Sequence, residues 1–201
     1  MTTPPYELRA RLQAAITRSL AASSDFDLNP TPCVNRVASL REAAVLVGVY
    51  STVNGASVLL TRRATHLKHH PNQVAFPGGK VEPKDADIHE AALREAQEEV
   101  GLNPQNVEVL GNLAPHETVT GFSVTPVIGL ISSMFTPQID ASEVAEAFWV
   151  PLVHLTKIEN FSIHERRWQS QTRKYYAVPF GPHYIWGATA RILRGLADRL
   201  V

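Results

Sequence analysis

Hydrophobic residues recur along the two ends of the chain at the spacing of a helix. In residues 6–22, four apolar positions predict an amphipathic helix that packs on the rest of the domain, namely Leu8, Leu12, Ile16 and Leu20. In residues 183–200, the same spacing predicts a C-terminal helix with an apolar face made of Ile185, Ile192, Leu196 and Leu200. Between the first helix and the first strand, residues 23–32 are rich in Ser, Asp, Asn and Pro, which predicts a loop.

The middle of the chain contains strand patterns. Residues 43–51 and 56–62 are apolar or alternating and flank Asn54-Gly55, a strong hairpin signal. Further strands are predicted at residues 107–114, 124–131, 147–152 and 174–179. Strands interspersed with helices predict an α/β fold, with a sheet between helical layers.

Residues 76–102 join a Pro-Gly-Gly loop to a short amphipathic helix. Its apolar stripe, which suits packing on a sheet, consists of Ala92, Ala96 and Val100, with Leu93 beside it. Asp85 or Asp87 is placed to cap the N-terminus of this helix, and Gly101 to end it in a left-handed conformation.

Three carboxylates share the polar face of this helix. Glu95, Glu98 and Glu99 are three and four residues apart and therefore gather on one side. A solvated acidic face is one interpretation, since like charges on an exposed helix cost only about 0.2–0.5 kcal/mol per pair. In a cleft with an effective dielectric near 20, the repulsion rises to ~3 kcal/mol per pair, and a hard cation such as Mg²⁺ or Mn²⁺ would be needed.

The order of residues around these carboxylates resembles the signature of Nudix hydrolases, G-x5-E-x7-R-E-U-x-E-E-x-G-U, where U is a bulky aliphatic residue. Residues 94–102, REAQEEVGL, match its second half, with a small residue at the first U position. In the first half, Gly79 and Arg94 are fifteen positions apart where the general signature has fourteen, and the first Glu is absent. Asp85 or Asp87 is the candidate replacement for that Glu.

An upstream stretch resembles a narrower branch of the same family. Residues 59–68, LLTRRATHLK, followed by FPGG at 76–79, look like the coenzyme A pyrophosphatase signature L-L-T-x-R-[SA]-x3-R-x3-G-x3-F-P-G-G. The longer Nudix box and the IWGATA run at 185–190 are also similar to this branch. Lys68 replaces an Arg, which keeps the charge but loses bidentate geometry, and Asn72 replaces a Gly while tolerating a left-handed backbone.

The resemblance implies an α/β/α sandwich with a mixed sheet and a catalytic loop–helix–loop at one edge. We expect residues 1–35 to form an N-terminal helix and loop packed on a Nudix domain at residues 36–201. The implied function is hydrolysis of a nucleoside diphosphate linked to another group, with coenzyme A or acyl-coenzyme A cut to 3′,5′-ADP and 4′-phosphopantetheine. The alternatives are another Nudix substrate (ADP-ribose, a dinucleoside polyphosphate or an RNA 5′ end) and a non-catalytic Nudix-fold binding module.

The resemblance also implies roles for individual residues. The Gly79 carbonyl and the carboxylates of Glu95, Glu98 and Glu99 would hold Mg²⁺ or Mn²⁺, while Arg94 would orient a glutamate through a charge-assisted hydrogen bond.

Other parts of the chain supply further candidates. Glu95 or an acid from residues 136–146 would take the proton from water, with Glu143 the first candidate in that segment and Glu146 the second. A basic segment before the glycine loop suits phosphate binding, and its candidates are Arg62, Arg63 and Lys68.

Three residues have competing interpretations. His116 is a candidate substrate contact or base, but its neighbours in sequence supply no orienting partner, which favours an ordinary loop histidine. Trp186 is a candidate for stacking on adenine, and a core aromatic is the favoured interpretation. Cys33 is the only cysteine, which excludes an intramolecular disulfide and a cysteine-based zinc site and favours a half-buried loop residue.

Composition narrows the range of partners. Lys+Arg and Asp+Glu both number 19, and this charge balance argues against a protein that coats nucleic acid. No signal pattern begins the chain, and the longest apolar run, residues 43–50, is too short to span a bilayer. We therefore expect a cytoplasmic enzyme for a small-molecule nucleotide substrate, without membrane contact, and with a homodimer as a further expectation.

Overall fold

The computed structural model describes residues 5–18, 21–29, 39–53, 55–168 and 171–200. The helices are α1 (Pro5–Thr17), α2 (Ile88–Val100), α3 (Leu152–Thr156) and α4 (Ala188–Leu200), with short 3-10 helices at Pro104–Asn106 and Ile158–Asn160. The strands are β1 (Ser23–Ser24), β2 (Arg41–Thr52), β3 (Gly55–Arg63), β4 (Val74–Ala75), β5 (Gly78–Lys80), β6 (Val107–Asn112), β7 (His116–Glu117), β8 (Phe122–Ile131), β9 (Val144–Pro151), β10 (Ser162–Trp168) and β11 (Gln171–Ala177).

Nine of these strands form one mixed sheet. Its main path runs β1-β7-β8-β2-β3-β4, with β5 paired to β2, β6 to β8 and β9 to β3. The predicted hairpin of β2 and β3 is present and antiparallel, whereas β2 and β8 run parallel. Strands β10 and β11 form a separate antiparallel pair.

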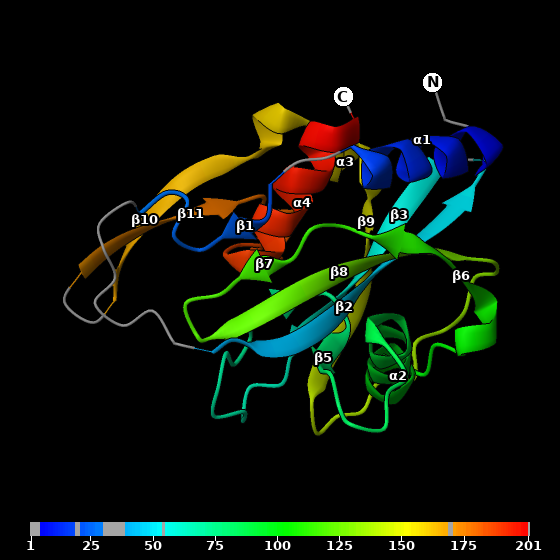
Figure 1. The fold of residues 1–201 in the computed structure, drawn as a ribbon, viewed down its shortest axis with the longest axis horizontal. Coiled ribbons are helices and arrows are strands. Elements are labelled where there is room, and N and C mark those ends of the chain that lie inside the picture. The colour runs from blue at the N-terminus through cyan, green and yellow to red at the C-terminus, as the bar shows by residue number, and fades with distance from the viewer. Residues whose placement is uncertain (1–4, 19–20, 30–38, 54, 169–170, 201) are drawn as a thin grey trace.

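Helices cover both faces of the sheet (Figure 1). The apolar stripe of α2 is buried on one face, against Leu46 and Leu59. On the other face, Leu12 of α1 and Leu193 of α4 belong to a larger core. The predicted α/β/α sandwich with a mixed sheet is therefore confirmed. Within the described residues, no helix combines the length and apolar character needed to cross a membrane.

The N-terminal segment departs from its sequence pattern. Helix α1 ends at Thr17, five residues before the predicted end at residue 22. The predicted loop at residues 23–32 contains β1, which pairs in parallel with β7, between the strands predicted at residues 107–114 and 124–131. Both strands have only two residues and are stabilised by a partner distant in sequence, so no local periodicity marks them.

The C-terminal region differs in a similar way. Helix α4 begins at Ala188, because the residues before it form a reversal in which the Val178 amide donates to the Ile185 carbonyl at 2.8 Å. Strand β10 was not expected from the sequence. Cys33 lies outside the described residues, and the division of the chain at residue 35 stays a prediction.

Candidate active site

The glycine loop brings the backbone of Gly79 against the carboxyl group of Glu95. Strand β5 pairs antiparallel with β2, which fixes Gly79 opposite Ala44 on the sheet. A Cβ atom at residue 79 would overlap the Glu95 carboxyl group. A larger residue at position 79 would therefore displace the Glu95 carboxyl group from the loop.

Both ends of α2 follow from local signals in the sequence. The Asp87 side chain caps the helix, its Oδ1 accepting the amides of His89 and Glu90, each at 2.8 Å. Gly101 ends the helix with φ 70° and ψ 19°, a left-handed conformation, as predicted. These two caps set where α2 begins and ends, and its buried apolar stripe sets which face is turned to the sheet.

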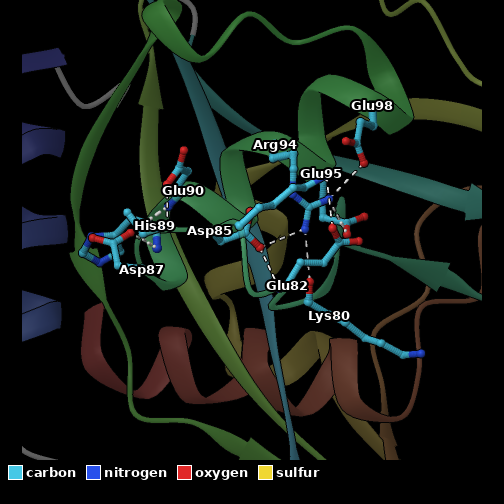
Figure 2. A network of polar contacts seen from close by, with 11 residues as sticks. Lys80, Glu82, Asp85, Asp87, His89, Glu90, Arg94, Glu95 and Glu98 are labelled. Atoms are coloured by element: carbon cyan, nitrogen blue, oxygen red, sulfur yellow. Dashed lines mark hydrogen bonds and ion pairs between the residues drawn. The ribbon is translucent and has the colours of Figure 1, made fainter.

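Arg94 is the centre of the polar network in Figure 2. Its Nε and Nη2 donate to the two oxygens of Asp85 at 2.8 and 3.1 Å, and Nη2 also donates to the Lys80 carbonyl at 3.1 Å. Its Nη1 donates to Glu95 at 2.9 Å and to Glu98 at 3.0 Å. The guanidinium therefore binds the glycine loop and two of the three clustered glutamates together.

Asp85 and Asp87, the two candidates for the missing acid of the signature, lie in different places. The Arg94 guanidinium lowers the pKa of Asp85 to about 2, and the Asp85 side chain is only 1% exposed. Asp87 is the helix cap and is 59% exposed. Asp85 is thus the residue attached to the glutamate cluster, through Arg94, a role that only the tertiary structure shows.

Glu99 is the most buried of the three glutamates, with 4% of its surface exposed. Burial raises the pKa of Glu99 to about 8, and the charges of Glu95 and Glu143 act in the same direction. The Arg63 charge and the Gly78 amide oppose this rise only in part. Among the described residues, Oε2 of Glu99 has no hydrogen-bond partner.

These oxygens fit a hard divalent cation. Carboxylates and carbonyls are the ligands that Mg²⁺ and Mn²⁺ prefer. Oε2 of Glu99 is a buried oxygen without a hydrogen-bond partner among the described residues, so it is available as a metal ligand. Within the described residues, no three acidic, His or Cys side chains already stand in a metal-binding arrangement. Glu95 and Glu98 are instead turned onto Arg94.

The two acidic candidates at the start of β9, Glu143 just before the strand and Glu146 within it, have different neighbours. Glu143 is exposed, and its charge acts on both Glu95 and Glu99, which places it beside the cluster. Glu146 accepts a hydrogen bond from Arg62 at 3.1 Å instead. Glu143 therefore lies within electrostatic reach of the glutamates, whereas the Glu146 carboxylate is hydrogen-bonded to Arg62.

The three predicted phosphate-binding cations are likewise separated. The Arg63 charge lowers the pKa of Glu99, so Arg63 lies within electrostatic reach of the glutamates. Arg62 is bound to Glu146 and to Asn72, the latter through Nη1 at 3.1 Å. Lys68 lies exposed on the loop between β3 and β4.

His116 is not the ordinary loop histidine that the sequence favours. It is fully buried in β7, where its Nδ1 lies 2.9 Å from Ser23 Oγ and its Nε2 lies 3.1 Å from Asp25 Oδ1. The interpretation as an ordinary loop histidine is therefore wrong. The neighbouring sequence shows no partner because both partners come from a segment more than ninety residues away. The contacts attach the N-terminal segment to the sheet edge.

Trp186 is half-buried and packs on Tyr175, with ring centroids 5.1 Å apart. The Arg166 guanidinium lies 5.4 Å from its ring centroid. These contacts belong to the β10–β11 pair and the reversal before α4.

A family model described as the NUDIX domain matches residues 40–171. A protein of Pectobacterium atrosepticum described as "Uncharacterized Nudix hydrolase NudL" is 41% identical, covering 86% of this chain and 89% of its own length. A protein of Salmonella dublin with the same description is 40% identical, covering 87% of this chain and 90% of its own length.

Solved structures share the fold. The crystal structure of a Nudix hydrolase from M. smegmatis, RenU, has a TM-score of 0.50 and 26% identity, covering 60% of this chain and 76% of that one. A MutT/nudix family protein from Enterococcus faecalis also has a TM-score of 0.50, with 18% identity, covering all of this chain and 75% of that one.

Proposed function

The chain belongs to the Nudix hydrolase family and is a pyrophosphohydrolase, and from this premise we propose that it cleaves the diphosphate of coenzyme A or acyl-coenzyme A. The products would be 3′,5′-ADP and 4′-phosphopantetheine. The observation that carries this proposal is the signature at residues 59–79, whose first arginine is Arg63. The positive charge of Arg63 lowers the pKa of Glu99, which supports a role for the arginine of this signature near the Nudix glutamates.

The Gly79 carbonyl and the carboxylates of Glu95, Glu98 and Glu99 would hold the divalent cation. When bound, Mg²⁺ or Mn²⁺ supplies Lewis-acid stabilisation of the phosphoryl charge and makes water more acidic. Arg94 donates to both Glu95 and Glu98 and so defines where these two carboxylates, which would hold the cation, lie on α2.

The chain's own groups then provide proton transfer and charge. Glu143 takes the proton from the attacking water, since it is exposed beside the cluster whereas Glu95 is already hydrogen-bonded to Arg94. Water adds to one phosphorus, the bridging P–O bond breaks, and the second phosphate leaves. Arg63, whose charge acts on Glu99, would stabilise the negative charge of a substrate phosphate.

The test is incubation with coenzyme A and Mg²⁺ or Mn²⁺, with chromatography of the products and a parallel panel of dephospho-coenzyme A, ADP-ribose and a dinucleoside polyphosphate. Release of 3′,5′-ADP as the fastest reaction supports the proposal. Faster hydrolysis of another diphosphate, with coenzyme A inert, would overturn the substrate and leave the pyrophosphohydrolase assignment standing.

A further inference from the structure

Arg62 is held on two sides by residues from different segments. Its Nε donates to Glu146 Oε2 of β9 at 3.1 Å, and its Nη1 donates to Asn72 Oδ1 of the β3–β4 loop at 3.1 Å. The Arg62 side chain is still 34% exposed. A guanidinium has five N–H donors, so two fixed bonds define its plane and leave donors for a ligand.

Asn72 makes its bond from an unusual backbone conformation. Its φ is 60°, in the left-handed region that Asn tolerates better than most residues. Its amide donates to the Arg63 carbonyl at 3.2 Å, and the Arg63 amide donates to the Gln73 carbonyl at 3.0 Å. The loop is therefore attached to the end of β3, which fixes the Asn72 side chain relative to Arg62.

Glu146, the other partner of Arg62, also has neighbours of its own. Oε1 of Glu146 lies 3.8 Å from Nε2 of His183, whose ring stacks on Phe148 with centroids 3.6 Å apart and an interplanar angle of 8°. Glu146 therefore has a different neighbour at each carboxylate oxygen, His183 at Oε1 and Arg62 at Oε2. Because the guanidinium is restrained before any ligand arrives, less side-chain entropy is lost when it binds an anion.

We propose that Asn72 is a positioning residue for Arg62, and that Arg62 held in this way binds a phosphate of the nucleotide substrate. The inference rests on the proposed function in one respect, that the substrate is a nucleotide diphosphate. A glycine at position 72 would adopt the same φ but would make no bond to Arg62. Glycine could adopt this loop conformation but has no side chain, whereas Asn72 adopts it and also binds Arg62.

The experiment is a double-mutant cycle with Asn72→Gly, Arg62→Ala and the double variant, measured on the diphosphate that the wild type hydrolyses fastest. Asn72→Gly is expected to raise KM about tenfold with kcat within about twofold, because a charge-assisted bond is lost outside the reacting centre. In the Arg62→Ala background the same change should have no further effect on KM. An equal increase of KM in both backgrounds, or a loss of kcat with KM unchanged, would overturn the proposal.

A second readout does not depend on turnover. In ¹⁵N-labelled protein, the Arg62 Nε–H resonance should shift on addition of inorganic pyrophosphate, with about tenfold weaker affinity in Asn72→Gly. Equal pyrophosphate affinity in the two proteins would overturn the role of Asn72. Failure of coenzyme A as a substrate affects neither result, so the two proposals fail separately.

Discussion

Arg94 donates two parallel hydrogen bonds to Asp85, from Nε to Oδ1 at 2.8 Å and from Nη2 to Oδ2 at 3.1 Å. This bidentate pair is almost completely enclosed, with 14% of the arginine and 1% of the aspartate side chain exposed. The same guanidinium binds Glu95 and Glu98 through Nη1. Asp85 thereby restrains two glutamates of the candidate metal site without contacting a ligand itself.

Asp85→Asn should weaken both stability and turnover. The loss of a charge-assisted pair is expected to cost about 1.5–3 kcal/mol in the free energy of unfolding, and a less restrained Arg94 should reduce turnover about 10–100-fold. Asp87→Asn is the matched control, because Asn caps a helix as well as Asp does and residue 87 is outside the Arg94 network. Urea unfolding and steady-state kinetics measure the two effects, and equal behaviour of the two variants would contradict the role of Asp85.

The same pair predicts a particular acid sensitivity. The pKa of Asp85 is about 2 in the folded protein, below its ordinary 3.8, so its carboxylate stabilises the fold above pH 3.8. That contribution is lost as the pH falls toward about 2. The free energy of unfolding should therefore decline with falling pH over this window, and Asp85→Asn should decline less steeply than the wild type. Identical pH slopes of the unfolding free energy in the wild type and Asp85→Asn would show that the Arg94–Asp85 pair does not lower the pKa of Asp85.

Glu99→Gln should stabilise the metal-free protein while abolishing its activity. The folded-state pKa of Glu99 is about 8, above its ordinary 4.5, so the folded protein holds a proton that the unfolded chain releases between these values. The wild-type free energy of unfolding should therefore fall as pH rises through that window, and Gln, which cannot ionise, removes this slope. At pH 8.5 in EDTA we expect the variant to be about 1–3 kcal/mol more stable by urea unfolding. A variant less stable than the wild type there would contradict this account.

His116→Ala should destabilise the fold without impairing the chemistry. It removes a fully buried ring and its contacts to Ser23 and Asp25, at an expected cost of about 2–4 kcal/mol. Hydrogen exchange at the β1 amides should accelerate, while kcat stays within about twofold under folding conditions. His69→Ala, on the exposed β3–β4 loop, is the control. A large loss of kcat with normal stability would assign His116 to catalysis.

The sequence predicted the elements whose signals are local. The β2–β3 hairpin, the apolar stripe of α2 and both ends of that helix are where the pattern places them. Each depends on neighbours within a few residues, such as the Asp87 cap or the left-handed Gly101. Local signals of this kind can be read without knowing how the chain folds.

Contacts between distant segments could not be predicted in the same way. His116 has its partners more than ninety residues upstream, so nothing beside it in the sequence identifies them. Helical spacing likewise extends the C-terminal pattern to Ile185, although that residue belongs to the reversal before α4. The sequence also groups Arg62 with Arg63, whereas the fold gives them different partners.

The most direct test of the central claim is the turnover of Glu98→Gln with coenzyme A and Mn²⁺. Glu98 is 54% exposed, so its replacement should leave the circular dichroism spectrum and the unfolding midpoint close to those of the wild type. If this glutamate is a ligand of the catalytic cation, kcat should fall by about two orders of magnitude or more. Wild-type turnover in the folded variant, with saturating metal, would contradict the assignment of this cluster as the catalytic metal site.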